Sequence, residues 1–382
     1  MEYRILGNTG LSVSVIALGC EGFVGKTEEQ VHSEMDFAIS KGINFIDMYT
    51  SNPDLRSNIG KALAERRQQF IIQGHLCATW ENDQYLRTRD VEKTIASFED
   101  QLTRLHTDYL DIGMIHYVDS EEDFHEVFNG PIIRLALRLK EEGKIRHIGL
   151  SSHNPIVAKL AVESGLIEVL MFSINPCYDL QPPSENVDDL WADESYAHSL
   201  ENIDPEREKL YELCEQKGIG LDVMKVYGGG DLLSETNSPF GKAMTPVQCI
   251  EYALTRPAVA SVMVGCKSCD EMQAAINWCN ATKEEKDYTP VMAGMEKFSW
   301  QGHCMYCGHC APCSVGIDIA SVNKYYNLTI AQNEIPETVR EHYKTLSHHA
   351  SECIQCGQCE TNCPFGVAII EQMEKAAEKF GY

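Results

Sequence analysis

The sequence is poor in the features that mark membrane, secreted and nucleic-acid-binding proteins. None of its apolar runs approaches the roughly 20 residues that a membrane-spanning helix needs. The first residues, MEYRILGNTG, contain no apolar core of a signal peptide. Basic residues are scarce as well, because 32 lysines and arginines stand against 57 aspartates and glutamates, a formal charge of −25. We therefore expect a cytoplasmic protein that binds neither membranes nor nucleic acids.

The length and the hydrophobic pattern predict a large α/β domain. With 382 residues the chain is long for one domain, so a smaller second domain is expected. Up to about residue 290, short apolar runs alternate with amphipathic stretches of helical length, which is typical of βα units in a parallel sheet. Eight such units predict a closed (β/α)8 barrel, the TIM barrel. The apolar runs are 14–20, 43–49, 70–76, 109–116, 145–151, 168–175, 219–225 and 260–266.

Two segments depart from this rhythm. The opening YRILGNTGLSVS carries an Asn-Thr-Gly turn, which predicts a hairpin before the first barrel strand. Residues 176–204 form a long connection after the sixth strand, with adjacent prolines and many acids. Active sites of such barrels lie at this end of the strands, so the loop is either a lid over the site or a solvated excursion.

Cysteine is abundant, and half of the 16 cysteines fall into two short windows near the C-terminus. Disulfides are rare in the cytoplasm, so clustered cysteines there indicate a metal site. The second window, with its terminal Pro364, matches the run of bacterial ferredoxins, and the repeated spacing predicts two [4Fe–4S] clusters. Zinc sites with four thiolates also use C-x2-C pairs and are the alternative. The first window is Cys304, Cys307, Cys310 and Cys313; the second is Cys353, Cys356, Cys359 and Cys363.

The last cysteine of each window is expected to serve the other window. In two-cluster ferredoxins three thiolates hold one cluster and the fourth ligates its neighbour. Cys363 would then complete the first site and Cys313 the second. The expectation is weaker for Cys313, because Ser314 stands where proline is usual. We expect a barrel domain at 1–291 and a small α-helical ferredoxin-like domain at 292–382, which relays electrons, with an electron-transfer protein as a candidate partner.

Five segments, in this order, resemble those of the aldo/keto reductases. They are YRILGNTGLSVSVIALG, GINFIDMY, RLHTDYLDIGMIH, GKIRHIGLSSH and ASVMVGCKS. The resemblance covers about residues 1–280, and the tail is similar to an iron–sulfur branch of that family. It implies a barrel that binds NAD(P)H without a Rossmann motif and reduces the carbonyl of a small-molecule substrate by hydride transfer. It also implies a catalytic tetrad of Asp, Tyr, Lys and His at strand ends.

Only half of this tetrad is present. Asp47 and His116 stand at the aspartate and histidine positions, whereas Asn52 stands where the family has tyrosine. The third strand, FIIQGHL, offers His75 and no lysine. Because an asparagine amide cannot deliver a proton, another acid is needed. His75 and His116 are the candidates, since imidazole titrates near about pH 6.5, with Asp47 orienting one of them; Tyr49 is a third candidate.

The positions that hold the cofactor in the family are better preserved. Glycine backbone can approach phosphate closely, and a lysine beside a hydroxyl suits a 2′-phosphate, which favours NADP(H) over NAD(H). The residues are Ser151 and Ser152 for the carboxamide, Asn175 beside them, Lys225, Gly228 and Gly229 for the pyrophosphate, and Lys267 and Ser268 for the adenosine phosphate.

Three functions remain open. The favoured one is an NAD(P)H-linked oxidoreductase that moves electrons between a barrel-bound substrate and two clusters. A hydride carries two electrons and a cluster takes one, so a flavin, a partner protein or a substrate with a stable radical would have to divide the pair. The second is an oxidoreductase or lyase that has lost carbonyl reduction and uses the clusters without nicotinamide. The third is a non-catalytic electron-transfer subunit with the barrel as scaffold.

Overall fold

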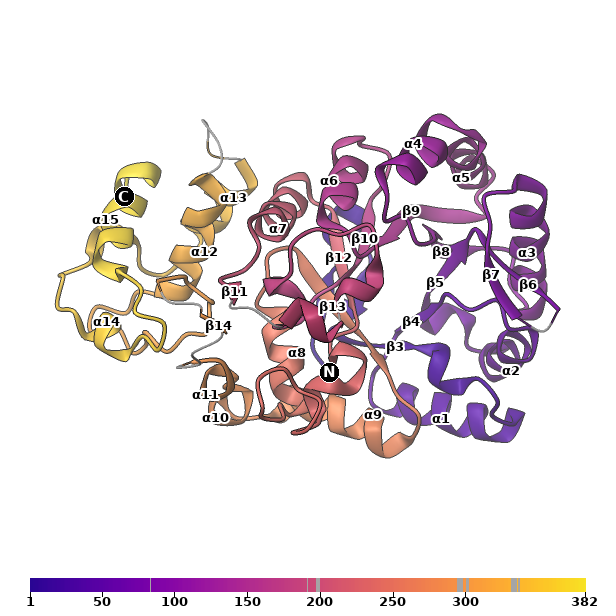
Figure 1. Ribbon diagram of the computed structural model, residues 1–382, viewed down its shortest axis with the longest axis horizontal. Coiled ribbons are helices and arrows are strands. Elements are labelled where there is room, and N and C mark those ends of the chain that lie inside the picture. The colour runs from indigo at the N-terminus through magenta and orange to yellow at the C-terminus, as the bar shows by residue number, and fades with distance from the viewer. Residues whose placement is uncertain are drawn as a thin grey trace.

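The computed structural model describes residues 1–82, 84–190, 192–196, 200–293, 298–299, 302–330, 335 and 337–382. Its largest unit is a closed barrel of eight parallel strands, which confirms the (β/α)8 fold (Figure 1). Each strand coincides with one of the eight apolar runs. Around the barrel they are β3 (Ile16–Gly19), β4 (Phe45–Met48), β5 (Ile71–Leu76), β8 (Leu110–Ile115), β9 (Ile145–Ser152), β10 (Val169–Ser173), β12 (Gly220–Met224) and β13 (Val259–Gly265).

Helices connect the strands and cover the outside of the barrel (Figure 1). Their starts are encoded locally: Thr27 and Thr245 form capping boxes with glutamines three residues on, and Asp90 accepts a hydrogen bond from the Lys93 amide. The helices are α1 (Glu28–Ser40), α2 (Pro53–Leu63), α3 (Val91–Arg104), α4 (Glu121–Asn129), α5 (Pro131–Glu141), α6 (Pro155–Glu163), α7 (Pro205–Lys217), α8 (Pro246–Leu254) and α9 (Cys269–Ile276).

The interior of the barrel changes from apolar to polar along the strands. Alternate residues of each strand point inward, and an apolar layer that includes Phe45, Met114 and Met171 fills one end. Two residues further along their strands, the inward positions carry Asp47, His116 and Ser173. This polar end is the carboxyl end of the strands, where sites of this fold are built.

Two hairpins and a long loop complete this part. The expected opening hairpin is confirmed, since β1 (Tyr3–Ile5) pairs antiparallel with β2 (Ser12–Ser14). A second hairpin, β6 (Ala78–Glu81) with β7 (Gln84–Arg87), follows β5 and was not expected. The loop after β10 contains short 3-10 turns at Tyr178–Leu180, Val187–Leu190 and Asp193–Tyr196, and then β11 (Leu200–Glu201).

The C-terminal part lies beside α7 and α8 (Figure 1). The expected boundary between residues 291 and 292 falls inside a short helix, so the division at that residue stays a prediction. No helix within the described ranges has the length and hydropathy of a membrane span. The elements are α10 (Lys283–Lys286), α11 (Thr289–Met292), β14 (Phe298–Ser299), which pairs with β11, α12 (Ile319–Ile330), α13 (Glu337–Lys344), α14 (Gln358–Asn362) and α15 (Ile369–Phe380).

Candidate active site and cluster sites

Three buried side chains form a hydrogen-bonded row at the carboxyl ends of β4, β5 and β8. His75 Nε2 lies 2.9 Å from Asp47 Oδ1, and His75 Nδ1 lies 2.7 Å from His116 Nδ1. The exposed fractions of Asp47, His75 and His116 are 3%, 2% and 8%. Three of the four residues expected to be catalytic are therefore in contact, and His75 of the third strand lies between the other two.

Hydrogen-bond chemistry places the protons of this row. A carboxylate only accepts, so His75 Nε2 carries a hydrogen that it donates to Asp47. A single proton can then lie between the two Nδ1 atoms. Burial, and next the neighbouring His75, lower the pKa of His116 well below its ordinary value, so His116 is neutral near neutral pH. When its Nδ1 donates to His75, its Nε2 is left as a proton acceptor.

Tyrosine rings surround His116. The Tyr49 ring stacks on it with centroids 5.7 Å apart and an interplanar angle of 6°, and Tyr85 on β7 meets it edge-on at 5.7 Å. Burial raises the pKa of the Tyr49 phenol, and so does its hydrogen bond to the Glu21 side chain. Burial also raises the pKa of Tyr85 to about 12. Both phenols are thus weaker acids than a free tyrosine. The sequence did not point to Tyr85, because the hairpin that carries it was not expected.

Asn52 is placed differently from the row. It precedes α2, and its side-chain oxygen accepts a hydrogen bond from the Leu55 amide at 2.9 Å, as an N-cap residue does. The described structure shows no hydrogen bond from Asn52 to Asp47, His75 or His116. A part for Asn52 in catalysis stays a prediction.

Deeper in the barrel, Gln73 joins two carboxyl groups. Its Nε2 lies 3.0 Å from Asp47 Oδ1 and 3.4 Å from Asp222 Oδ1. Burial, and next the nearby Asp47, raise the pKa of Asp222 well above its ordinary value, so Asp222 is protonated near neutral pH. Sequence reasoning missed both Gln73 and Asp222. The alternation of strand β5 was a usable signal, since Gln73 lies two residues before His75.

A buried hydroxyl that is not among the predicted site residues lies on the strand next to that of Ser151 and Ser152. Ser173 is the last residue of β10, at the carboxyl end of the strand. Its Oγ has no hydrogen-bond partner in the described part of the chain, and a bound polar group would satisfy it. Ser151 Oγ accepts a hydrogen bond from the Tyr117 amide at 2.9 Å. Ser152 Oγ instead donates to Asp119 Oδ1 at 2.9 Å, and thereby holds the turn after β9. Ser151 and Ser173 fit a nicotinamide carboxamide better than Ser152 does.

The predicted pyrophosphate loop leaves its backbone open. It follows β12, and Gly228 and Gly229 have φ of 59° and 71°, where a side chain would be strained. A Cβ added at Gly229 would meet no heavy atom within 4 Å, so a ligand can approach this backbone. Asn175 Nδ2 donates to the Lys225 carbonyl at 2.9 Å and ties this loop to β10, while burial lowers the pKa of Lys225. The loop fits a phosphate-bearing cofactor.

The residues expected at the adenosine end of the cofactor are less favourable to a 2′-phosphate. Ser268 caps α9 by accepting from the Glu271 amide at 3.2 Å, and the Lys267 amide donates to Glu271 Oε2 at 2.7 Å. The Lys267 side chain is exposed. Because the Glu271 carboxylate occupies a donor that an anion would use, the preference for NADP(H) stays a prediction.

A cavity of about 320 Å³ lies between the long loop and the glycine loop. Tyr178, Leu190 and Tyr196 line one side, and Gly228 and Asp231 line another. The long loop therefore borders the mouth of the barrel, as a lid would; closure stays a prediction, and residues 191 and 197–199 of the loop lie outside the described residues.

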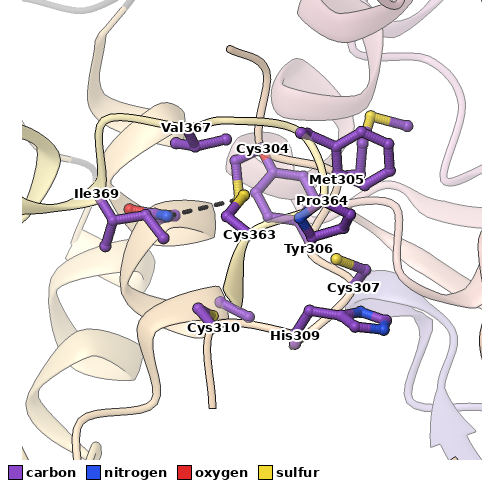
Figure 2. A pocket seen from close by; sticks show the side chains of 14 residues that line it. Cys304, Met305, Tyr306, Cys307, His309, Cys310, Cys363, Pro364, Val367 and Ile369 are labelled. Atoms are coloured by element: carbon purple, nitrogen blue, oxygen red, sulfur yellow. Dashed lines mark hydrogen bonds between the residues drawn. The ribbon is translucent and has the colours of Figure 1, made fainter. Parts of the chain in front are cut away.

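The eight clustered cysteines border two cavities. The last cysteine of each window lies at the cavity of the other window, as expected. Figure 2 shows the first cavity, with Cys363 of the second window facing Cys304 and Cys310 of the first. The first is bordered by Cys304, Cys307, Cys310 and Cys363, and the second by Cys313, Cys353, Cys356 and Cys359.

The cysteine cavities fit iron–sulfur cubes. Among the described residues no three His, Cys, Asp or Glu side chains converge as ligands of a single ion would; the thiols instead surround a space. Polar groups also face the sulfur atoms, as Asn323 Nδ2 lies 3.5 Å from Cys304 Sγ (dashed line in Figure 2) and Ser314 Oγ lies 3.5 Å from Cys356 Sγ. Such donors tune cluster potentials. Ligation by each cysteine stays a prediction.

Family models match both parts of this architecture, and the known proteins reported below share part of it. The Aldo/keto reductase family model matches residues 15–248, and the 4Fe-4S dicluster domain model matches residues 300–367. The uncharacterized oxidoreductase YqkF of Bacillus subtilis is 28% identical over 304 residues, which cover 75% of this chain and 94% of YqkF. L-galactose dehydrogenase of Arabidopsis thaliana is 31% identical over 160 residues, 40% of this chain and 48% of that protein. The holo form of aldo-keto reductase AKR11C1 from Bacillus halodurans has the same fold, with a TM-score of 0.58, 23% identity and coverage of 75% and 94%.

Proposed function

The chain belongs to the aldo/keto reductase family and ends in a 4Fe-4S dicluster domain, and from this premise we propose that it is an NAD(P)H-linked oxidoreductase that moves electrons between a barrel-bound small molecule and two [4Fe–4S] clusters. The observation that carries the proposal is the buried row Asp47–His75–His116 at the active end of the barrel. It supplies proton transfer at the place where Tyr and Lys are missing.

The row can take up a proton in one direction and deliver it in the other. As a substrate hydroxyl is oxidised, His116 Nε2 accepts the hydroxyl proton and the Nδ1 proton moves to His75. Asp47 then stabilises the imidazolium of His75 through the 2.9 Å hydrogen bond. When bound, the nicotinamide supplies hydride transfer and the clusters supply one-electron transfer. Dividing the electron pair requires a flavin or a partner electron-transfer protein, which we include in the proposal.

The activity of this row should tolerate mild acid. Because the pKa of His116 is lowered, its neutral, proton-accepting form persists below about pH 6.5, where a free histidine titrates. We expect kcat/KM for alcohol oxidation to stay level from pH 8 down through pH 6.5 and to fall only at lower pH. The measurement is a pH profile of kcat/KM on the wild-type holoenzyme. A decline centred at pH 6.5 or above would contradict the assignment of His116 as the base.

Nucleotide addition to oxygen-free protein tests the proposed function. We expect NADPH or NADH to bind and to bleach the visible absorption of the clusters, while dithionite serves as the positive control for reduction. Nucleotide that neither binds nor bleaches, in protein that dithionite does bleach, would favour the oxidoreductase or lyase that works without nicotinamide. Bound nucleotide without bleaching would show that the dividing cofactor or partner is missing.

A substitution in the glycine loop should weaken nucleotide binding. Gly229→Val places a side chain on the open backbone at φ 71°, so we expect the Kd for NAD(P)H to rise about tenfold or more, equivalent to ~1.4 kcal/mol. Gly143→Val is the matched control, because Gly143 has φ 74° and equally open surroundings but lies in the turn before β9, at the other end of the barrel. Isothermal titration of both variants gives the comparison; equal affinities would remove the loop from the cofactor site.

A further inference from the structure

A buried arginine lies between the barrel and the first cysteine window. Arg256 stands in the loop from α8 to β13 and is 1% exposed. Its Nη2 donates to the Met305 carbonyl at 2.6 Å and to Thr255 Oγ1 at 3.0 Å. Its Nε and Nη1 have no hydrogen-bond partner in the part of the chain that the structure describes. Met305 lies between Cys304 and Cys307, so Arg256 contacts the loop that borders the first cavity.

Aromatic rings fix this guanidinium in place. It lies over the rings of Tyr252 at 4.6 Å and Tyr306 at 5.4 Å. Tyr288, whose ring meets that of Tyr252 at 5.4 Å, donates its hydroxyl hydrogen to the same Met305 carbonyl at 2.9 Å. Two donors, the charged Arg256 and the neutral Tyr288, therefore hold one carbonyl of the cysteine loop.

The charge of Arg256 has no carboxylate at contact distance among the described residues. Asp179 and Glu208 act on it only from further away, and Asp179 lies 3.7 Å from Arg207, with which it forms an ion pair. A buried cation without a counter-charge is strongly unfavourable. The anion that fits is on the other side of Met305 and Tyr306, where four thiolates would surround a cluster. Such a cluster has a net negative charge that increases by one on reduction.

We propose that Arg256 is the counter-charge of the first cluster and raises its reduction potential. The inference rests on the clusters of the proposed function but not on nicotinamide. A fixed positive charge stabilises the more negative, reduced form of a neighbouring cluster. No lysine or arginine is among the described residues that line either cavity, and Arg256 reaches the lining of the first through the Met305 carbonyl. Arg256 therefore separates the potentials of two sites whose cysteine ligand sets are alike.

A redox titration followed by electron paramagnetic resonance tests this. It uses anaerobically purified holoenzyme, wild type and Arg256→Gln; glutamine keeps an N–H for the Met305 carbonyl and removes the charge. We expect the equilibrium constant for reduction of one cluster to fall about tenfold or more, which is about 59 mV for one electron. The other cluster should shift by less than half as much. Two unchanged couples in fully loaded Arg256→Gln protein would overturn the inference.

Two further variants separate charge from hydrogen bonding. Tyr288→Phe removes the neutral donor to Met305 and is expected to leave both couples within about twofold of wild type. Should Arg256→Gln protein lose iron, Arg256→Lys decides: restored iron content shows that charge is required, whereas loss in both variants shows that hydrogen-bond geometry is required and overturns the inference. Wild-type protein without two cluster couples would instead refute the proposed function.

Discussion

Replacing His116 with alanine is expected to lower kcat by about 10²- to 10⁴-fold while leaving the affinity for nucleotide unchanged. The ring is the end member of the buried row, and its Nε2 is the atom left to exchange a proton with substrate. Steady-state kinetics with an alcohol or carbonyl substrate, together with nucleotide titration, separates the two quantities. The pocket wall stays in place because Tyr49 and Tyr85 also contact each other, with ring centroids 5.9 Å apart.

The neighbours of His116 should act with it and not independently. If His75 only passes on the proton that His116 accepts, then the double variant His75→Gln/His116→Ala should be no slower than His116→Ala alone. Exposed His125 on α4 provides the control, since His125→Ala should keep wild-type kcat. A His116→Ala enzyme with wild-type kcat would exclude His116 as the proton carrier, and additive losses in the double variant would exclude the row as a unit.

The barrel was predictable because its strands are buried on both sides. Runs such as INFIDMY and ASVMVGC are continuous and apolar, and they are bounded by glycine or by charged helices, so length and composition identify each strand. The β6–β7 hairpin was not predictable in this way. Its sequence, ATWENDQYLR, is short and polar, and its second strand is mostly exposed, so no hydrophobic period distinguishes it from a loop.

Only those parts of the candidate site were predictable that have a local signal in the sequence, such as residue spacing or strand order. Cysteine spacing determines which thiols can reach one cluster, and the structure brings together the same two sets of four. The pairing of His75 with His116 followed from strand order, but the bridge from Asp47 through Gln73 to Asp222 did not, because β12 is far away in sequence. Arg256 was not identified either, since nothing in its own segment indicates burial beside Met305.

Cys363→Ala is expected to remove the first cluster and to spare the second. Although Cys363 belongs to the second window in sequence, it lies with Cys304, Cys307 and Cys310 around the first cavity. Alanine leaves that cavity with three thiols and no replacement ligand, so iron should fall from about eight to about four atoms per chain. Acid-labile sulfide should fall in the same ratio, and one of the two reduction couples should disappear.

Which reduction couple disappears in Cys363→Ala shows whether the two cysteine windows exchange ligands or each hold their own cluster. If the windows exchange ligands, Cys363→Ala removes the couple that responds to Arg256→Gln, because Arg256 lies behind Met305 at the first cavity. If each window holds its own cluster, the responsive couple survives and the other is lost. Cys279→Ala is the control, since Cys279 is half-buried near Met1 and outside both windows, and its iron content should equal that of wild type. The same comparison with Cys313→Ala tests the reverse exchange, which should abolish the couple that does not respond.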